Sequence, residues 1–157
     1  MDQSGTLLAA DLAQRALADE WFAHYQYWFG SVVVPDKWEN AILQFVEHSS
    51  DEYDHATELA GWLNRVPREG KIPRILPEVG NGKMYGCGFI LPRTDEPRSL
   101  VEENLRGERC AIRFYTEFID KISRVEYYGA DLGNVLEDIL AKEKEHAADL
   151  EKLLRQL

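Results

Sequence analysis

The amino-acid sequence predicts an all-α fold: an antiparallel four-helix bundle with one long crossover loop between the second and third helices. In four long stretches, apolar residues recur at steps of three and four, which is the spacing of a helix with one buried face. The first and last connections between these stretches are short, so the helices they join are antiparallel neighbours. A chain of 157 residues, 45% of them hydrophobic, can form one core. We therefore expect a single domain over 1–157.

The first two helices are expected at about 7–33 and 36–66. Pro35 ends the helical pattern of the first stretch. Asp36, followed three residues later by Glu39, imitates a capping box and predicts the start of the second helix.

The crossover loop is expected at 67–98. Five prolines and five glycines lie in this segment, and its apolar residues show no helical period. Its length is enough to cross the whole bundle, and loops of this length usually have a function.

The third and fourth helices are expected at about 99–128 and 131–155. Ser99 and Glu102 form a capping box at the start of the third helix. Gly129 can cap its end, because glycine readily adopts the left-handed conformation found there.

The charge of the chain excludes some classes of function. Acidic residues outnumber basic ones by 28 to 18, and the formal net charge is -10. Binding phosphates requires lysine and arginine, so this balance argues against direct DNA binding. The first residues lack the positive run and apolar core of a signal peptide, and no stretch has the roughly 18 apolar residues of a membrane span. We expect a cytoplasmic protein with no membrane contact.

Two Glu-x-x-His motifs are the main chemical signal. Glu52 and His55 lie in the second helix, and Glu143 and His146 lie in the fourth. Residues three positions apart share one face of a helix, so each motif presents a carboxylate and an imidazole together. One such motif alone is common on a solvated surface. The helical neighbours of Glu143 are apolar, however, which predicts that its motif points into the core.

The first and third helices each add an inward glutamate, Glu20 and Glu108, because both have apolar neighbours at helical steps. Burying an unpaired carboxylate costs several kcal/mol, so four of them in one core need a shared positive charge. Lysine and arginine are absent from these faces at the needed level, which argues against a metal-free salt-bridge network. A metal cluster is therefore favoured.

One glutamate from each of two helices, with a Glu-x-x-His motif from each of the other two, is the ligand set of di-iron carboxylate bundles. Carboxylates with imidazoles suit iron or manganese, and the lack of a thiolate argues against structural zinc. The expected metal ligands are Glu20, Glu52, His55, Glu108, Glu143 and His146.

Three segments around these residues, 20–28, 47–56 and 108–112, resemble the Dps-like ferritins, also called thioferritins. The resemblance covers nearly the whole chain. It implies a ferritin-like fold with a bacterioferritin-type di-iron site that holds two iron ions per subunit, in a homo-oligomeric cage of twelve subunits. It further implies oxidation of Fe(II), with hydrogen peroxide as the preferred oxidant, storage of ferric iron and protection against oxidative stress. The roles it implies are terminal ligands for Glu20 and Glu108, bridging carboxylates for Glu52 and Glu143, and one imidazole per iron from His55 and His146.

Two cysteines and two further histidines have roles that the sequence leaves open. From the sequence alone, Cys110 is a small hydrophobe at a helix interface and Cys87 is incidental. The resemblance implies instead that the two are a redox-active thiol pair near the irons. His24 and His48 lie one helical turn from Glu20 and Glu52. Either histidine could support the metal ligands, lie on the path by which iron enters, or occupy a surface or interface position. The sequence leaves these three roles open.

Rival functions differ in sequence features that can be checked. Bacterioferritin binds haem through a methionine directly after the second-helix glutamate, but Tyr53 stands there, so no haem is expected. A bacterioferritin-type iron store that uses dioxygen needs the same six ligands and stays open. A rubrerythrin-like peroxidase normally carries two Cys-x-x-Cys motifs, which this chain lacks. A structural or nucleoid-associated bundle would leave the four inward glutamates and the acidic charge without explanation.

Overall fold

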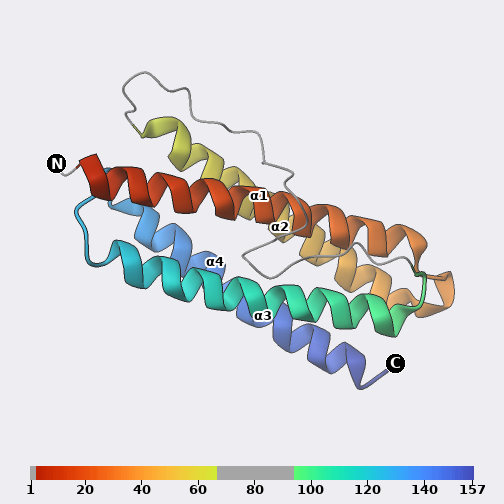
Figure 1. The fold of residues 1–157 in the computed structure, drawn as a ribbon. Helices are drawn as coiled ribbons and strands as arrows, with labels where there is room; N and C mark the ends of the chain where they lie inside the picture. Colours follow the sequence, from red (N-terminus) through yellow and green to blue (C-terminus); the bar gives the residue numbers. More distant parts are fainter. Residues whose placement is uncertain (1–2, 67–93) are drawn as a thin grey trace.

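The computed structural model describes residues 3–66 and 94–157 and confirms the all-α four-helix bundle (Figure 1). A long connection joins the second and third helices, and residues 67–93 of the predicted loop lie outside the described part. Packing is closest between α1 and α2 and between α3 and α4. None of the described helices has the length and apolar character needed to cross a membrane. The elements are α1 Gln3–Val33, the short 3-10 helix η1 Asp36–Trp38, α2 Glu39–Arg65, α3 Pro97–Ile122 and α4 Asp131–Leu154.

The start of α3 differs from the prediction, because Ser99 and Glu102 do not form its cap. The helix begins at Pro97, and the N-cap is Glu96. The Glu96 carboxylate accepts hydrogen bonds from the backbone N–H groups of Arg98 at 3.1 Å and of Ser99 at 2.6 Å. Proline suits the first helical position because an N–H group there would have no partner within the helix.

Two further boundaries also differ from the prediction. Helix α3 ends at Ile122, well before 128, so Gly129 lies in the connection to α4 instead of capping α3. Its φ of 79° shows that this connection uses the left-handed conformation that favours glycine. Asp36 opens η1, and neither η1 nor α2 has a side-chain hydrogen bond at its N-cap.

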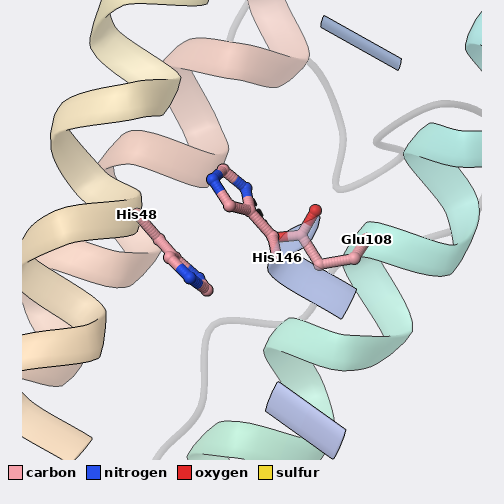
Figure 2. A group of neighbouring side chains, drawn as sticks. All are labelled: His48, Glu108 and His146. Atoms are coloured by element: carbon pink, nitrogen blue, oxygen red, sulfur yellow. Dashed lines mark ion pairs between the residues drawn. The ribbon is translucent and has the colours of Figure 1, made fainter. Parts of the chain in front are cut away.

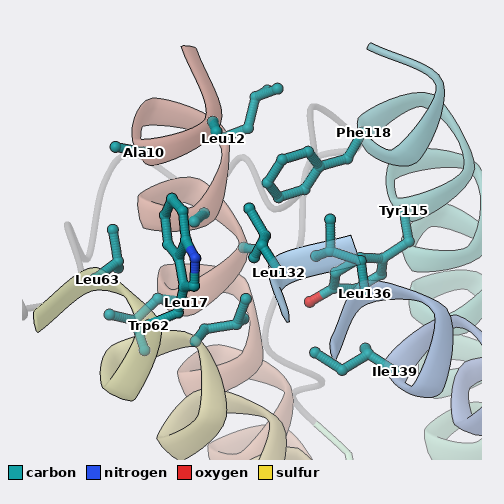
Figure 3. Close-up of a cluster of buried hydrophobic side chains, with 14 of the residues drawn as sticks. Ala10, Leu12, Leu17, Trp62, Leu63, Tyr115, Phe118, Leu132, Leu136 and Ile139 are labelled. Atoms are coloured by element: carbon teal, nitrogen blue, oxygen red, sulfur yellow. The ribbon is translucent and has the colours of Figure 1, made fainter. Parts of the chain in front are cut away.

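The apolar core consists of two clusters, one toward each end of the bundle. The first includes Leu17, Trp62, Phe118 and Leu136, one from each helix (Figure 3). The second is built mainly from the other end of each helix and holds Tyr27, Phe45, Leu100 and Leu150. In every helix, the inward glutamate predicted from the sequence lies between the two clusters along the chain. The fold therefore places one polar layer between two apolar ones.

Candidate metal centre

The polar layer contains all six side chains that the sequence analysis selected. Helix α1 contributes one glutamate, α3 contributes one, and α2 and α4 contribute a glutamate and a histidine each. All six are buried, and none is more than 6% exposed: Glu20, Glu52, His55, Glu108, Glu143 and His146.

The ligand atoms of these residues form two overlapping groups. Within each group, one donor atom per residue lies within 4.8 Å of the others. Glu52 and Glu143 belong to both groups, so two carboxylates lie between the two positions. The buried histidine and glutamate groups are consistent with a dinuclear metal site. The first group is Glu20, Glu52, His55 and Glu143, and the second is Glu52, Glu108, Glu143 and His146.

At one end of the site, His55 contacts three carboxylates through a single nitrogen. His55 Nδ1 lies 3.2 Å from Glu20 Oε2, 3.2 Å from Glu52 Oε2 and 3.1 Å from Glu143 Oε1. The Tyr115 hydroxyl donates a hydrogen bond to Glu20 Oε1. One nitrogen surrounded by three acceptors marks a point where a cation would be well coordinated.

At the other end, His146 Nδ1 lies 3.2 Å from Glu52 Oε1 and 3.7 Å from Glu108 Oε1. The Tyr27 hydroxyl donates to Glu108 Oε1. The second nitrogen, His146 Nε2, lies 3.1 Å from Asp51 Oδ2. A carboxylate on the far nitrogen of an imidazole fixes the tautomer that leaves Nδ1 free to bind metal. The sequence analysis did not identify Asp51, although it directly precedes Glu52.

The two carboxylates that both groups share, Glu52 and Glu143, hold protons in the metal-free site. Burial raises the pKa of Glu52 and of Glu143 to about 8, and the negative charges of neighbouring glutamates add to this effect. Burial and the Glu143 charge raise the pKa of Glu108 well above its ordinary value. Four carboxylates this close together cannot all be ionised without a cation between them.

The imidazoles respond to the same carboxylates in the opposite sense. Burial alone would lower the pKa of His146, but its contacts with Glu52 raise that pKa to about 9. The pKa of His55 is also raised, since its hydrogen bonds to Glu143, Glu20 and Glu52 outweigh its burial. Glu20 is the one carboxyl of the set whose pKa is lowered, to about 2, because its contacts with His55 outweigh its burial. In the metal-free chain, protons therefore supply the positive charge that a metal would bring.

Unpartnered polar atoms test whether a metal fits these residues. Glu52 Oε1, Glu143 Oε1 and His146 Nδ1 are buried, and within the described ranges their contacts at 3.1–3.2 Å lack the geometry of a hydrogen bond. Buried polar atoms in folded proteins are nearly always satisfied. All three atoms are of the kinds that bind iron or manganese, and their residues belong to one group whose donor atoms lie within 4.8 Å of one another. The residues present therefore fit a divalent metal pair.

Comparison with known protein families shows which family the chain belongs to. The ferritin-like domain family matches residues 10–157. The chain belongs to the ferritin-like family. This result confirms the resemblance found in the sequence. No curated protein was found to match this ferritin-like protein.

Solved structures agree with this assignment. A dodecameric thioferritin, the bacterioferritin-related protein from Bacteroides fragilis, has a TM-score of 0.74 and 30% identity, over 94% of this chain and 84% of that one. A ferritin-like diiron-carboxylate protein from Bacillus anthracis has a TM-score of 0.76 and 22% identity, over 98% and 99%. The Rhodobacter capsulatus bacterioferritin, which has haem iron and a metal-free dinuclear site, has a TM-score of 0.69 and 23% identity, over 94% and 84%. The last two likenesses concern the fold alone.

The structure separates the two histidines whose roles the sequence left open. His24 is partly exposed, and its Nδ1 lies 2.8 Å from the backbone oxygen of Ser49. His48 is buried, and its ring stacks on that of His146 with 4.0 Å between ring centroids (Figure 2). His48 therefore belongs to the polar layer of this ferritin-like protein, whereas His24 supports the packing of α1 on α2.

The predicted thiol pair stays a prediction, because Cys87 lies outside the described residues. Cys110 is buried on α3, two residues after Glu108. Its sulfur lies 3.3 Å from Arg113 Nη2.

Proposed function

We propose that this ferritin-like protein is a ferroxidase that oxidises Fe(II) at the site built from the six buried ligands and stores the ferric product in a homo-oligomeric cage. The observation that supports it best is the pair of overlapping ligand groups that share Glu52 and Glu143. Two ions bridged in this way can each give up one electron to a single two-electron oxidant.

Each residue of the site has a task in this reaction. Glu52 and Glu143 release their protons when Fe(II) binds, because the metal charge replaces the protons that their raised pKa values retain. His55 and His146 bind through Nδ1, the nitrogen that faces the carboxylates. The hydroxyls of Tyr115 and Tyr27 hold the terminal carboxylates of Glu20 and Glu108 in place. Manganese fits the same ligands.

Hydrogen peroxide is the oxidant that we propose, on the ground of the resemblance to thioferritins. One peroxide takes one electron from each of two Fe(II), accepts two protons as its O–O bond breaks, and leaves as two waters. Dioxygen is the alternative oxidant. If the protein is not an enzyme, the alternative is a helical bundle with a purely structural role and no metal. The same proposal includes protection of the cytoplasm from peroxide.

A cage is proposed from two observations. The thioferritin with 30% identity is dodecameric, and the large apolar side chains that the described residues expose all lie on α1 and α2. Large apolar side chains exposed on two helices that pack together are typical of an interface between subunits. We propose twelve subunits for the cage.

The test is anaerobic loading with Fe(II), followed by parallel additions of peroxide and dioxygen while the near-ultraviolet ferric absorbance is recorded. Fast oxidation at two Fe(II) per peroxide, with slow oxidation by dioxygen, supports the proposal. Rapid oxidation of Fe(II) by dioxygen would instead indicate a bacterioferritin-type iron-storage protein. The double variant Glu52→Ala with His55→Ala should lose oxidation, and Thr57→Ala, an exposed change on the same helix, should keep it. Retained oxidation in the double variant would contradict the site.

A further inference from the structure

The rings of Tyr27, His48 and His146 pack against one another at the Glu108–His146 end of the site. The two imidazoles are stacked, with 4.0 Å between their centroids and an angle of 22° between their planes (Figure 2). Tyr27 makes a T-shaped contact with each, at centroid distances of 5.1 Å to His48 and 6.4 Å to His146. All three residues are at most 2% exposed. One predicted ligand, His146, thus lies inside a packed block of rings.

Among the described residues, the other end of the site has no such block. The ring nearest to that of His55 is His146, with 6.1 Å between centroids. Helices α2 and α4 carry the same Glu-x-x-His motif, but one turn before Glu52 is His48, whereas one turn before Glu143 is Ile139. The buried histidine at position 48 therefore lies outside the repeated ligand pattern and needs an explanation of its own.

Hydrogen bonds fix which nitrogen of His48 carries the proton. Gln44 Nε2 lies 3.3 Å from Asp149 Oδ2 and 3.0 Å from His48 Nε2. A carboxylate only accepts hydrogen bonds, so the Gln44 amide nitrogen faces both groups and donates to His48 Nε2. The ring proton of His48 is then on Nδ1. His48 is therefore a neutral imidazole without a free lone pair for metal, and its ring is anchored at Nε2.

The hydrogen bonds of His146 restrain its ring less completely. His146 Nε2 lies 3.1 Å from Asp51 Oδ2, and this partly exposed carboxylate also lies 3.8 Å from Lys142 Nζ. His146 Nδ1 contacts Glu52 and Glu108 but forms no hydrogen bond with the described residues. A single hydrogen bond tolerates a range of ring tilts, because its angle is only loosely restrained. A ring stacked on the face of the imidazole restricts the tilt directly.

We propose that His48 is a positioning residue for His146: its anchored ring covers one face of the His146 imidazole and keeps Nδ1 directed at the metal position before metal binds. The inference rests on the proposed dinuclear site and adds to it a residue that does not itself bind metal. A ligand that is held in place in advance loses less conformational freedom on binding, so the affinity for metal is higher.

The first test is crystallographic and needs no metal. In crystals of the chelator-treated wild type, the His146 ring should have one orientation, stacked on His48. His48→Leu removes the flat ring but keeps an apolar side chain in the core, so the His146 ring should turn or occupy two orientations. His48→Phe restores a flat ring and should restore the single orientation. An unchanged His146 ring in folded His48→Leu would overturn the inference.

The second test measures Co(II) binding to the full chain by calorimetry, without any oxidant. We expect His48→Leu to weaken the binding of one of the two Co(II) ions by about threefold to tenfold, the range that one aromatic stack provides. His48→Phe should stay within about twofold of the wild type, because it keeps the stack. Ile139→Leu, an apolar change at the corresponding position of α4, is the matched control and should keep both affinities.

The outcomes separate the role of His48 from the site on which it rests. If His48→Phe loses as much Co(II) affinity as His48→Leu, the stacked ring is not the cause, and the inference is wrong while the dinuclear site stands. A wild-type crystal in which the two imidazoles are not stacked would also overturn it, whether or not the variants fold. A wild type that binds no Co(II) contradicts the dinuclear site itself, and with it the role of His48.

Discussion

Asp51 shows how a residue outside the ligand set controls a ligand. Its carboxylate lies 3.1 Å from His146 Nε2 and also 3.8 Å from Lys142 Nζ. The contact with His146 keeps the proton on Nε2 and leaves Nδ1 for metal. At the corresponding position of the other motif, Lys142 precedes Glu143 and cannot accept a hydrogen bond.

Asp51→Ala should therefore weaken Co(II) binding at one of the two positions by about 10–100-fold, as measured by calorimetry. Lys142→Met is the control, because it removes the ion pair with Asp51 but leaves the contact with His146. The role given to Asp51 fails if both variants lose the same affinity.

The titrating groups of the site predict how the metal-free protein responds to pH. Glu52 and Glu143 have a pKa of about 8 when folded, against 4.5 when unfolded, and His146 has about 9 against 6.5. The folded chain therefore binds these protons more tightly, and the stability they provide is lost as pH rises from about 5 to about 9.

Urea unfolding in the presence of a chelator should thus show a free energy of unfolding that falls by several kcal/mol between pH 6 and pH 9. The double variant Glu52→Gln with Glu143→Gln carries two groups that do not titrate, so its stability should depend less on pH. Added Co(II) should stabilise the wild type most at the high end of this range, since metal then replaces absent protons. A flat pH profile for the metal-free wild type would contradict this account.

At the residue scale, sequence reasoning reached the six predicted ligands because each one repeats a simple signal, a glutamate with apolar helical neighbours or a Glu-x-x-His pair. Asp51 and His48 had no such signal. Their contacts depend on how α2 and α4 are rotated against each other. The spacing of apolar residues within one helix carries no information about that rotation. Whether the six bind metal stays a prediction.

The connection before α4 is the element whose backbone depends most on one residue. Gly129 has a φ of 79°, and a Cβ atom there would lie 2.8 Å from Trp62 Nε1. Trp62 Nε1 also donates a hydrogen bond to the Gly129 oxygen at 3.3 Å, which ties α2 to this turn.

Gly129→Ala should lower the free energy of unfolding by about 1–3 kcal/mol, through the left-handed conformation and the crowding of Trp62. Gly61→Ala is the matched control within α2, where the added Cβ would meet only Arg65 Nη1 at 3.9 Å. That change should stabilise the protein by about 0.5–1 kcal/mol. Equal effects of the two changes in urea unfolding would refute the argument.

Sequence patterns predicted the four helices and their order well, because the apolar period extends over many turns. Their ends were predicted less well. Ser99 and Glu102 matched a capping box, but Glu96 with Pro97 satisfies the same N–H groups one turn earlier. Gly129 suggested a helix end, yet α3 stops at Ile122, where the buried face ends.

At the scale of the whole molecule, the exposed apolar side chains should decide the assembly. Val32 on α1 is 62% exposed and Leu43 on α2 is 60% exposed. In the proposed cage such side chains are covered by neighbouring subunits, and a buried charge there would lack a partner.

Leu43→Glu with Val32→Glu should reduce the cage to smaller species in analytical ultracentrifugation while the circular dichroism of the helices is unchanged. Thr116→Glu, an exposed position on α3, is the control and should leave the assembly intact. A cage that survives the double change would place the interface elsewhere.

The polar layer between two apolar clusters also has a consequence for the lifetime of the chain in a cell. Because a metal that binds the folded site and not the unfolded chain stabilises the fold, the empty protein opens more often than the loaded one. Proteases cut open chains, so degradation should be faster when iron is scarce. The abundance of the protein would then follow its iron supply without any change in gene expression.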